Sequence, residues 1–293
     1  MLITLKNSSL TVTIEDRGAQ LTSVKAPDGT EYIWQADPAV WGRHSPNLFP
    51  VIGRLHDDRY TLAGKPHTMP MHGFCRDAVF TVSGQTDTAA AFTYTQNEDT
   101  LALWPFPFVL TIAYTLEGNA LKKTVTVENP GGDTMFYEYG GHDGYNAPLC
   151  PGETMADYAI VLEGLTSITP YGMTPEEGML TPKAAPIPLE KGRIHLKPYH
   201  YGLDTLVLDT FSTKRAMLVD QAGRARVTVD FSDFPYLALW TQARDTDTNY
   251  VCIEPWTTLP DCTFVGRGLE DKAGICTLAP GGSATHTYTT TFD

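Results

Sequence analysis

The chain has 293 residues, enough for one large domain or two of ordinary size. Its 21 basic and 34 acidic side chains give a formal net charge of −13 with histidine neutral. That charge argues against nucleic-acid binding and against docking on anionic lipid, because both need a basic surface. A hydrophobic fraction of 42% with only 19% charged residues indicates a folded globule.

The sequence shows no sign of export or of a membrane span. The N-terminal residues lack the basic patch and apolar core of a secretory signal, and no run of about 18 apolar residues occurs. Five scattered cysteines without a C-x-x-C pair fit neither a disulfide framework nor a zinc ribbon. We therefore expect a cytoplasmic protein, monomer or homodimer, that binds neither nucleic acid nor membrane.

Alternating apolar and polar residues predict β-strands along the whole chain, from near its start to its end. Turn signals such as Asn129-Pro-Gly-Gly132 separate them. The clearest predicted strands, in chain order, are residues 10–14, 90–95, 111–116, 124–128, 205–208, 226–230 and 285–292.

Helical segments are expected to be short, at residues 38–42, 98–103 and 268–273. Residues 163–198 are rich in proline and glycine and predict a long surface excursion. No repeat of fixed period and no linker is visible. We expect a single domain over residues 1–293, an all-β fold built as a large antiparallel sandwich with a few short helices.

Several common enzyme classes lack their motifs here. There is no Walker loop, no G-x-G-x-x-G before a helix, no G-x-S-x-G and no H-E-x-x-H. Nucleotide-dependent chemistry, serine hydrolysis of the α/β type and zincin proteolysis are therefore unsupported.

Polar residues in apolar, turn-rich surroundings are the remaining candidates. Glu254 interrupts an apolar run that predicts a buried strand, which Pro255 is expected to end. A carboxylate there must be paired, hydrogen-bonded or functional, because burying it alone costs several kcal/mol. The glycine-rich segment around His142 and Asn146 favours close approach of a ligand to the backbone.

Three further candidates have strong structural alternatives. Arg54 is either a surface arginine at the end of a strand or a guanidinium that holds substrate hydroxyls. His72 is either a buried structural histidine or part of a site, and Asp204 is either a turn residue or a ligand-binding carboxylate. Together with Trp34, Trp240 and Trp256, these groups suggest a sugar site, because pyranose rings pack on aromatic faces.

The order and spacing of these residues resemble the aldose 1-epimerase (galactose mutarotase) family, particularly its LacX-like bacterial branch. The resemblance covers nearly the whole chain and implies a β-supersandwich fold. It is carried by Arg54 in Phe-Pro-Val-Ile-Gly-Arg, His72 in Met-His-Gly-Phe, His142 in Gly-Gly-His-Asp-Gly-Tyr-Asn, Asp204 before Thr-Leu-Val-Leu, and Glu254 in Cys-Ile-Glu-Pro-Trp.

The resemblance implies a mutarotase that interconverts the α- and β-anomers of a free aldohexose. Glu254 would be the general base at the anomeric hydroxyl, His142 the general acid at the ring oxygen, and His72 a second group near that oxygen. It implies no metal and no organic cofactor. The residues expected to bind the sugar are Arg54, Asp204, Asn146 and Trp240.

The sequence leaves two other functions and the identity of the sugar open. One alternative is a non-catalytic sugar-binding or sensing protein, and the other is a glycosidase with Asp204 and Glu254 as its carboxylate pair. The acidic net charge favours a neutral ligand. A hexose phosphate would need additional basic residues, for which Arg43, Arg76 and Arg244 are available.

Overall fold

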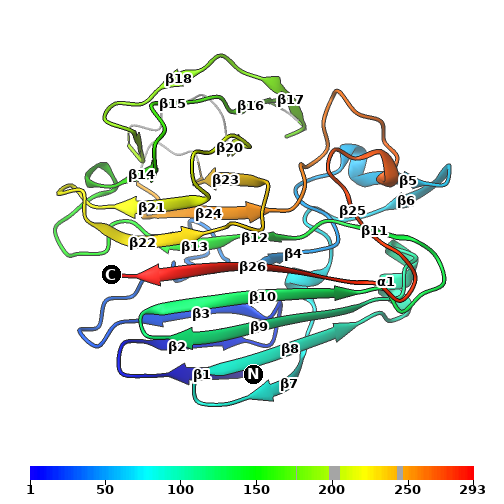
Figure 1. Cartoon of the computed structure of the whole chain (residues 1–293), viewed down its shortest axis with the longest axis horizontal. Coiled ribbons are helices and arrows are strands. Elements are labelled where there is room, and N and C mark those ends of the chain that lie inside the picture. Colours follow the sequence, from blue (N-terminus) through cyan, green and yellow to red (C-terminus); the bar gives the residue numbers. More distant parts are fainter. Residues whose placement is uncertain (176, 198–204, 243–246) are drawn as a thin grey trace.

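The computed structural model describes residues 1–175, 177–197, 205–242 and 247–293. Strands dominate this part of the chain, and every pair of named strands is antiparallel. Two sheets make up most of the molecule, with β26 running through its middle (Figure 1). The all-β antiparallel architecture expected from the alternation is therefore confirmed.

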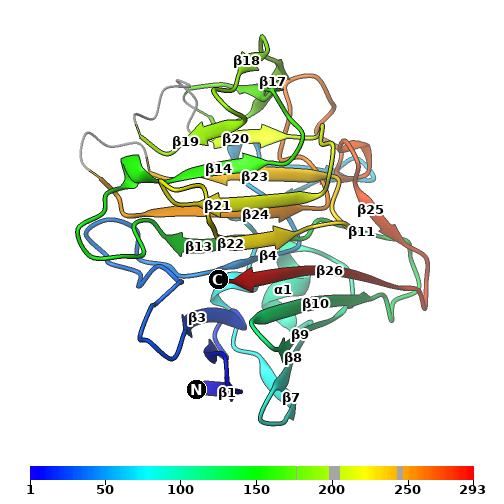
Figure 2. The same cartoon turned by 60° about the vertical axis from the view of Figure 1, so that its left-hand side comes forward.

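The larger sheet has nine strands and contains the longest ones. In spatial order they are β19 (Arg193–His195), β14 (Ala159–Leu162), β21 (Arg215–Val219), β22 (Ala225–Asp230), β26 (Ser283–Phe292), β10 (Ala120–Glu128), β9 (Val109–Glu117), β8 (Ala89–Thr95) and β7 (Thr81–Gln85). Figure 2 shows β14, β21 and β22 stacked above β26 and β10 in this sheet.

The second sheet has six strands. They are β20 (Thr205–Leu208), β23 (Tyr236–Trp240), β24 (Tyr250–Trp256), β12 (Gly140–Gly141) and β4 (Asn47–Leu48), with β13 (Asp143–Asn146) also paired to β24. Its strands run alongside those of the larger sheet in both views (Figures 1 and 2).

Smaller elements complete the fold. The three-stranded sheet is β1 (Leu2–Lys6), β2 (Thr11–Glu15) and β3 (Gln20–Lys25). The two-stranded pairs are β5 (Arg59–Leu62) with β6 (Lys65–Thr68), β11 (Met135–Tyr137) with β25 (Cys276–Leu278), β15 (Ser167–Ile168) with β18 (Ile187–Pro188), and β16 (Tyr171–Met173) with β17 (Leu180–Lys183). The helices are α1 (Glu98–Leu103) and the 3₁₀ turns His56–Asp58, Cys75–Asp77, Met155–Asp157 and Leu269–Asp271.

Two of the three expected helices are wrong or reduced. Helix α1 is confirmed at the expected residues. Asn97 and Thr100 form a reciprocal capping box that stabilises its N-terminus. Residues 38–40 form a turn instead, beside which the Asp37 carboxylate accepts from the Ala39 amide, and residues 41–42 are irregular. The expected helix at 268–273 is a single 3₁₀ turn.

The expected surface excursion at residues 163–198 is also partly wrong. This segment forms the short strands β15 to β19, and β19 joins the edge of the nine-stranded sheet. A proline-rich sequence is compatible with edge pairing, since edge strands need only half of their backbone hydrogen bonds.

Strand β10 shows how the alternation builds the core. One of its inward-facing residues is charged rather than apolar. Leu121, Val125 and Val127 point inward and are buried, while the intervening residues are less so. Lys123 occupies the same inward phase and is 2% exposed. A lysine is almost never buried without a partner, so its environment must supply one.

The partner of Lys123 comes from the other sheet. Its Nζ donates to Asp143 Oδ1 at 2.8 Å, and the Tyr288 hydroxyl of β26 donates to Asp143 Oδ2 at 2.8 Å. Burial is the largest single influence and lowers the pKa of Lys123, but Asp143 and Tyr114 together outweigh it and the net pKa is raised, so the lysine stays protonated. This buried Lys123–Asp143–Tyr288 network connects the two sheets directly beside His142.

In the part of the chain that the structure describes, no helix has the length and apolar character needed to span a membrane.

Replacing Lys123 by methionine should destabilise the protein by about 3–5 kcal/mol, because Asp143 would remain buried without its cationic partner. Urea unfolding measures the loss. The matched control is Lys122→Met, since Lys122 is exposed on the outward face of the same strand and should change stability by less than about 0.5 kcal/mol. Equal effects of the two substitutions would contradict this account.

Candidate functional site

A cavity of about 760 Å³ opens beside the six-stranded sheet. This volume lies within the range of roughly 300–1,000 Å³ typical of small-molecule sites. Its walls come from segments far apart in the sequence: residues 41–54, residues 71–76, His142, the β16–β17 hairpin, and the ends of strands β23 and β24. Such convergence is what a binding site needs and what sequence order does not reveal.

Strand β24 supplies the carboxylate. Its residues alternate between the main core, which contains Val251 and Ile253, and the other face of the sheet, which carries Glu254 and Trp256 toward the cavity. The strand runs through Pro255, which pairs with Leu237, so the expectation that Pro255 ends it is wrong.

The strand register brings His142 to Glu254. Gly140 pairs with Trp256, and Asp143 pairs with Ile253. In an antiparallel ladder this register puts His142 opposite Glu254, with both side chains on the same face. His142 Nε2 lies 3.4 Å from Glu254 Oε1, and the two residues are 7% and 1% exposed.

Aromatic rings enclose the imidazole of His142. Trp41 stacks on it with ring centroids 5.1 Å apart, and Trp240 meets it edge-on at 5.5 Å. Burial in these surroundings lowers the pKa of His142 to about 3, and the positive charges of Arg76 and Arg43 act in the same direction. The imidazole of His142 is therefore neutral at neutral pH.

His72 is held close to this pair by the backbone. Its ring centroid lies 5.7 Å from that of His142, and its Nδ1 accepts from the Gly53 amide at 3.1 Å. Because Nδ1 accepts, the neutral ring carries its proton on Nε2. Desolvation and the neighbouring His142 hold the pKa of His72 well below its usual range.

Gly73 and Gly144 allow the close packing around His72 and His142. His72 has the left-handed φ of 65°, uncommon for a residue with a side chain, and Gly73 follows with φ 71°. A Cβ on Gly73 would lie 2.2 Å from the Phe49 carbonyl oxygen. A Cβ on Gly144 would lie 2.9 Å from the ring of Trp41 that stacks on His142. Gly144, in the glycine-rich segment, thus allows Trp41 to approach the backbone closely.

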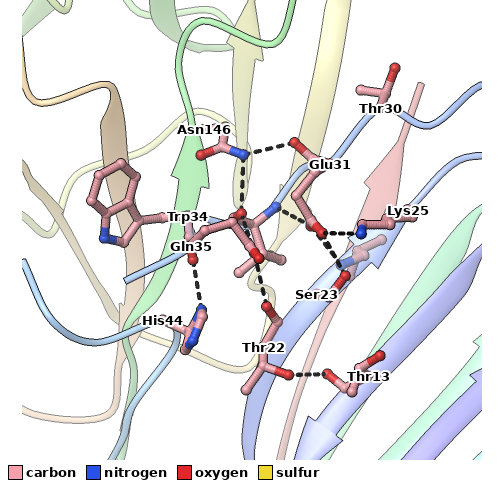
Figure 3. Close-up of polar contacts among 12 residues, drawn as sticks. Thr13, Thr22, Ser23, Lys25, Thr30, Glu31, Trp34, Gln35, His44 and Asn146 are labelled. Atoms are coloured by element: carbon pink, nitrogen blue, oxygen red, sulfur yellow. Dashed lines mark hydrogen bonds and ion pairs between the residues drawn. The ribbon is translucent and has the colours of Figure 1, made fainter. Parts of the chain in front are cut away.

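The other predicted binding residues separate into three groups. Arg54 and Trp240 line the cavity, and Arg54 is exposed, with its Nε 3.7 Å from Asp58 Oδ1. Asn146 does not line it: its amide donates to the carbonyls of Glu31 and Ile33 and fastens that loop (Figure 3). Asp204 lies outside the described residues.

Of the three tryptophans expected at a sugar site, Trp240 and Trp256 line the cavity and Trp34 does not. Trp34 packs with Tyr250 behind the cavity wall. The sequence analysis missed Trp41, which follows a turn and has no neighbouring motif to mark it.

Cys252 is the one thiol near the catalytic candidates in the described part of the chain. Ligand atoms of His142, Cys252 and Glu254 lie within 4.8 Å of one another, close enough to hold a metal ion. Burial, together with the Glu254 charge, raises the pKa of the Cys252 thiol well above its usual value. The thiol therefore stays protonated at neutral pH.

Comparison with known proteins identifies the family. The model of the aldose 1-epimerase family matches residues 1–290. The chain belongs to the aldose 1-epimerase family. Two LacX proteins of Lactococcus lactis subsp. lactis, one chromosomal and one plasmid-borne, are each 32% identical to it, over 96% of this chain and 95% of their own length.

Solved structures of relatives give the same result for the fold. A galactose mutarotase related enzyme from Lactobacillus acidophilus has a TM-score of 0.93 at 32% identity, covering 100% of this chain and 97% of that one. A galactose mutarotase-like protein from Lactobacillus casei has a TM-score of 0.86 at 32% identity and covers both chains fully. The supersandwich implied by the sequence resemblance is confirmed.

His142 should stay neutral in the folded protein from pH 8 down to about pH 4, because burial lowers its pKa to about 3. Its ¹⁵N-detected imidazole signals should not shift over this range, whereas in urea they should titrate near the ordinary value of about 6.5. A titration near pH 6.5 in the folded protein would contradict this.

The same shift predicts acid sensitivity. Below about pH 6.5 the unfolded chain takes up a proton that the folded site rejects, so stability is lost as the pH falls from about 6.5 toward 3. Thermal unfolding of His142→Asn should show a smaller loss over this interval than the wild type.

Proposed function

We propose that this protein is a mutarotase that interconverts the α- and β-anomers of an aldohexose by opening and closing its ring. The observation that carries the proposal is the buried pair of His142 and Glu254, 3.4 Å apart at the wall of a cavity large enough for a sugar. Membership of the aldose 1-epimerase family supports the reaction class.

Glu254 acts as the base in this proposal. Its carboxylate takes the proton of the anomeric hydroxyl, the electrons form the C1 carbonyl, and the bond from C1 to the ring oxygen breaks. His142, which must first take up a proton from solvent, gives that proton to the ring oxygen as the imidazolium and returns to the neutral imidazole, leaving the open-chain aldehyde. After rotation about the C1–C2 bond the two groups reverse their roles, and the ring closes on the other face.

The environment of His142 sets the condition for this step. Its lowered pKa makes the imidazolium scarce at neutral pH but a much stronger acid than free histidine, and an ether oxygen is a weak base that needs a strong donor. Glu254 Oε1 lies 3.4 Å from His142 Nε2, where a carboxylate favours the imidazolium. His72 is suited to polarise the same oxygen, because its neutral ring has a proton on Nε2.

The aromatic rings support a pyranose as ligand. Trp41, Trp240 and Trp256 line the cavity, and their faces suit the apolar C–H surface of a sugar. Arg54 is the candidate donor to sugar hydroxyls at the exposed side.

Replacing Glu254 by glutamine should lower the rate of anomer exchange at least 100-fold, because the base is lost while the shape of the side chain is kept. His142→Asn should lower it to a similar extent. Exchange is measured by NMR and polarimetry against a panel of aldoses, with the buffer rate subtracted. Sugar affinity, measured by calorimetry, should change by less than about 10-fold.

The control is Glu128→Gln, an exposed glutamate at the end of β10, which should leave the rate unchanged. A wild type no faster than buffer with every sugar, but with affinity for one of them, would replace the proposal by a non-catalytic sugar-binding protein. Release of sugar from a glycoside would favour the glycosidase instead.

A further inference from the structure

Three charged side chains are enclosed close to the cavity but do not line it. Glu138 is fully buried, and the side chains of Lys272 and Asp261 are 3% and 15% exposed. Lys272 Nζ lies 2.6 Å from Glu138 Oε1 and donates to Asp261 Oδ1 at 2.9 Å. Replacing such buried ion pairs by apolar side chains often leaves stability unchanged or raises it. Stability alone therefore does not explain this Glu138–Lys272–Asp261 network.

Both carboxylates of the network hold one segment of backbone. Glu138 Oε2 accepts from the Ile52 amide at 2.6 Å, and Asp261 Oδ2 accepts from the His56 amide at 2.9 Å. Residues 53–55, which lie between these two amides, belong to no strand or helix. The network therefore fixes, at both ends, a segment that no sheet positions.

This segment reaches the cavity at Gly53 and Arg54. The Gly53 amide donates to His72 Nδ1 at 3.1 Å, and the His72 amide donates back to the Gly53 carbonyl at 2.8 Å. Gly53 has a left-handed φ of 69°, and a Cβ there would lie 2.9 Å from Pro260, the residue before Asp261. The amide that faces His72 thus depends for its position on the backbone that the network holds.

Lys272 keeps its charge within the network. Burial is the largest single influence on its pKa and lowers it, but Glu138 and Asp261 together outweigh burial and the net pKa is raised. The lysine therefore stays protonated at neutral pH and compensates the charge of the carboxylates that hold the backbone.

We propose that the Glu138–Lys272–Asp261 network is a positioning device for His72. It holds the backbone on both sides of Gly53, whose amide in turn holds Nδ1 of His72. Which ring nitrogen of a neutral histidine carries the proton is set by the hydrogen bond that the other nitrogen makes. The network thereby keeps the His72 proton on Nε2, where it can polarise the ring oxygen of the sugar. This inference rests on the proposed mutarotase function.

The first test compares two double variants that both lack the buried charges. Glu138→Leu with Lys272→Met removes the acceptor of the Ile52 amide, and kcat for anomer exchange should fall about 10- to 100-fold, as expected when a catalytic group is displaced by about 1 Å. Glu138→Gln with Lys272→Met keeps an oxygen that can accept from this amide, and should recover kcat to within about 3-fold of the wild type. Equal losses in the two variants would contradict the proposal.

The matched control for these variants is a buried carboxylate away from the cavity. Asp220 is 2% exposed, accepts from the Arg224 amide at 3.0 Å and does not line the cavity. Asp220→Asn should therefore leave kcat unchanged. Circular dichroism checks that each variant is folded. If the leucine variant does not fold, Glu138→Asp replaces it, because a carboxylate shorter by one methylene stays near Lys272 but withdraws from the Ile52 amide.

A double-mutant cycle tests whether the loss passes through His72. In a His72→Asn background, Glu138→Leu with Lys272→Met should lower kcat by less than about 3-fold further, because the group that the network positions is already absent. A further loss as large as in the wild-type background would show a general structural effect and overturn the proposal.

The ¹⁵N signals of His72 test the positioning without any reaction. In the wild type at neutral pH, Nδ1 should give the signal of an unprotonated nitrogen and Nε2 that of a protonated one, since the ring is neutral. In the leucine variant the two signals should move toward each other as both tautomers become populated, and in the glutamine variant they should stay apart.

The outcomes separate this inference from the proposed function. Unchanged His72 signals in the folded leucine variant overturn the positioning role, whether or not the wild type anomerises a sugar. If no sugar is anomerised but the signals move as expected, the network still positions His72 and the mutarotase falls.

Discussion

The pairing of β24 with β12 and β13 is the constraint on which the rest of the site depends. Its register places His142 across from Glu254 and directs both side chains out of the main core. Because side chains alternate along a strand, a shift of one residue would turn Glu254 into the core and Ile253 toward the cavity. The proximity of His142 and Glu254 is therefore a property of strand register, and the same hydrogen bonds that build the sheet hold the two side chains in position.

Burial gives this pair its chemical character. The aromatic rings around His142 exclude water and lower its pKa to about 3, while one residue along the chain Asp143 is fully compensated by Lys123 and Tyr288. Neighbouring residues of one segment thus serve different purposes: Asp143 fastens the two sheets together and His142 faces the cavity.

Particular residues show which features of the structure the sequence predicts and which it does not. The capping pattern of Asn97 and Thr100 sets the start of α1, and alternation locates β9 and β10, because both signals are local. Glu254 was identified because a carboxylate in an apolar run is costly wherever that run lies. Asn146 was misjudged as a binding residue, since a loop amide can serve a ligand or a neighbouring backbone and only the fold chooses between them. Trp41 had no local signal at all.

The sequence by itself determined the fold class, the family and the identity of the acid–base candidates. Each depends on local order along the chain: the period of two in the strands, the turn residues, and motifs read in sequence. Only the tertiary structure decided which groups meet, since His142 and Glu254 are 112 positions apart and are joined by strand register.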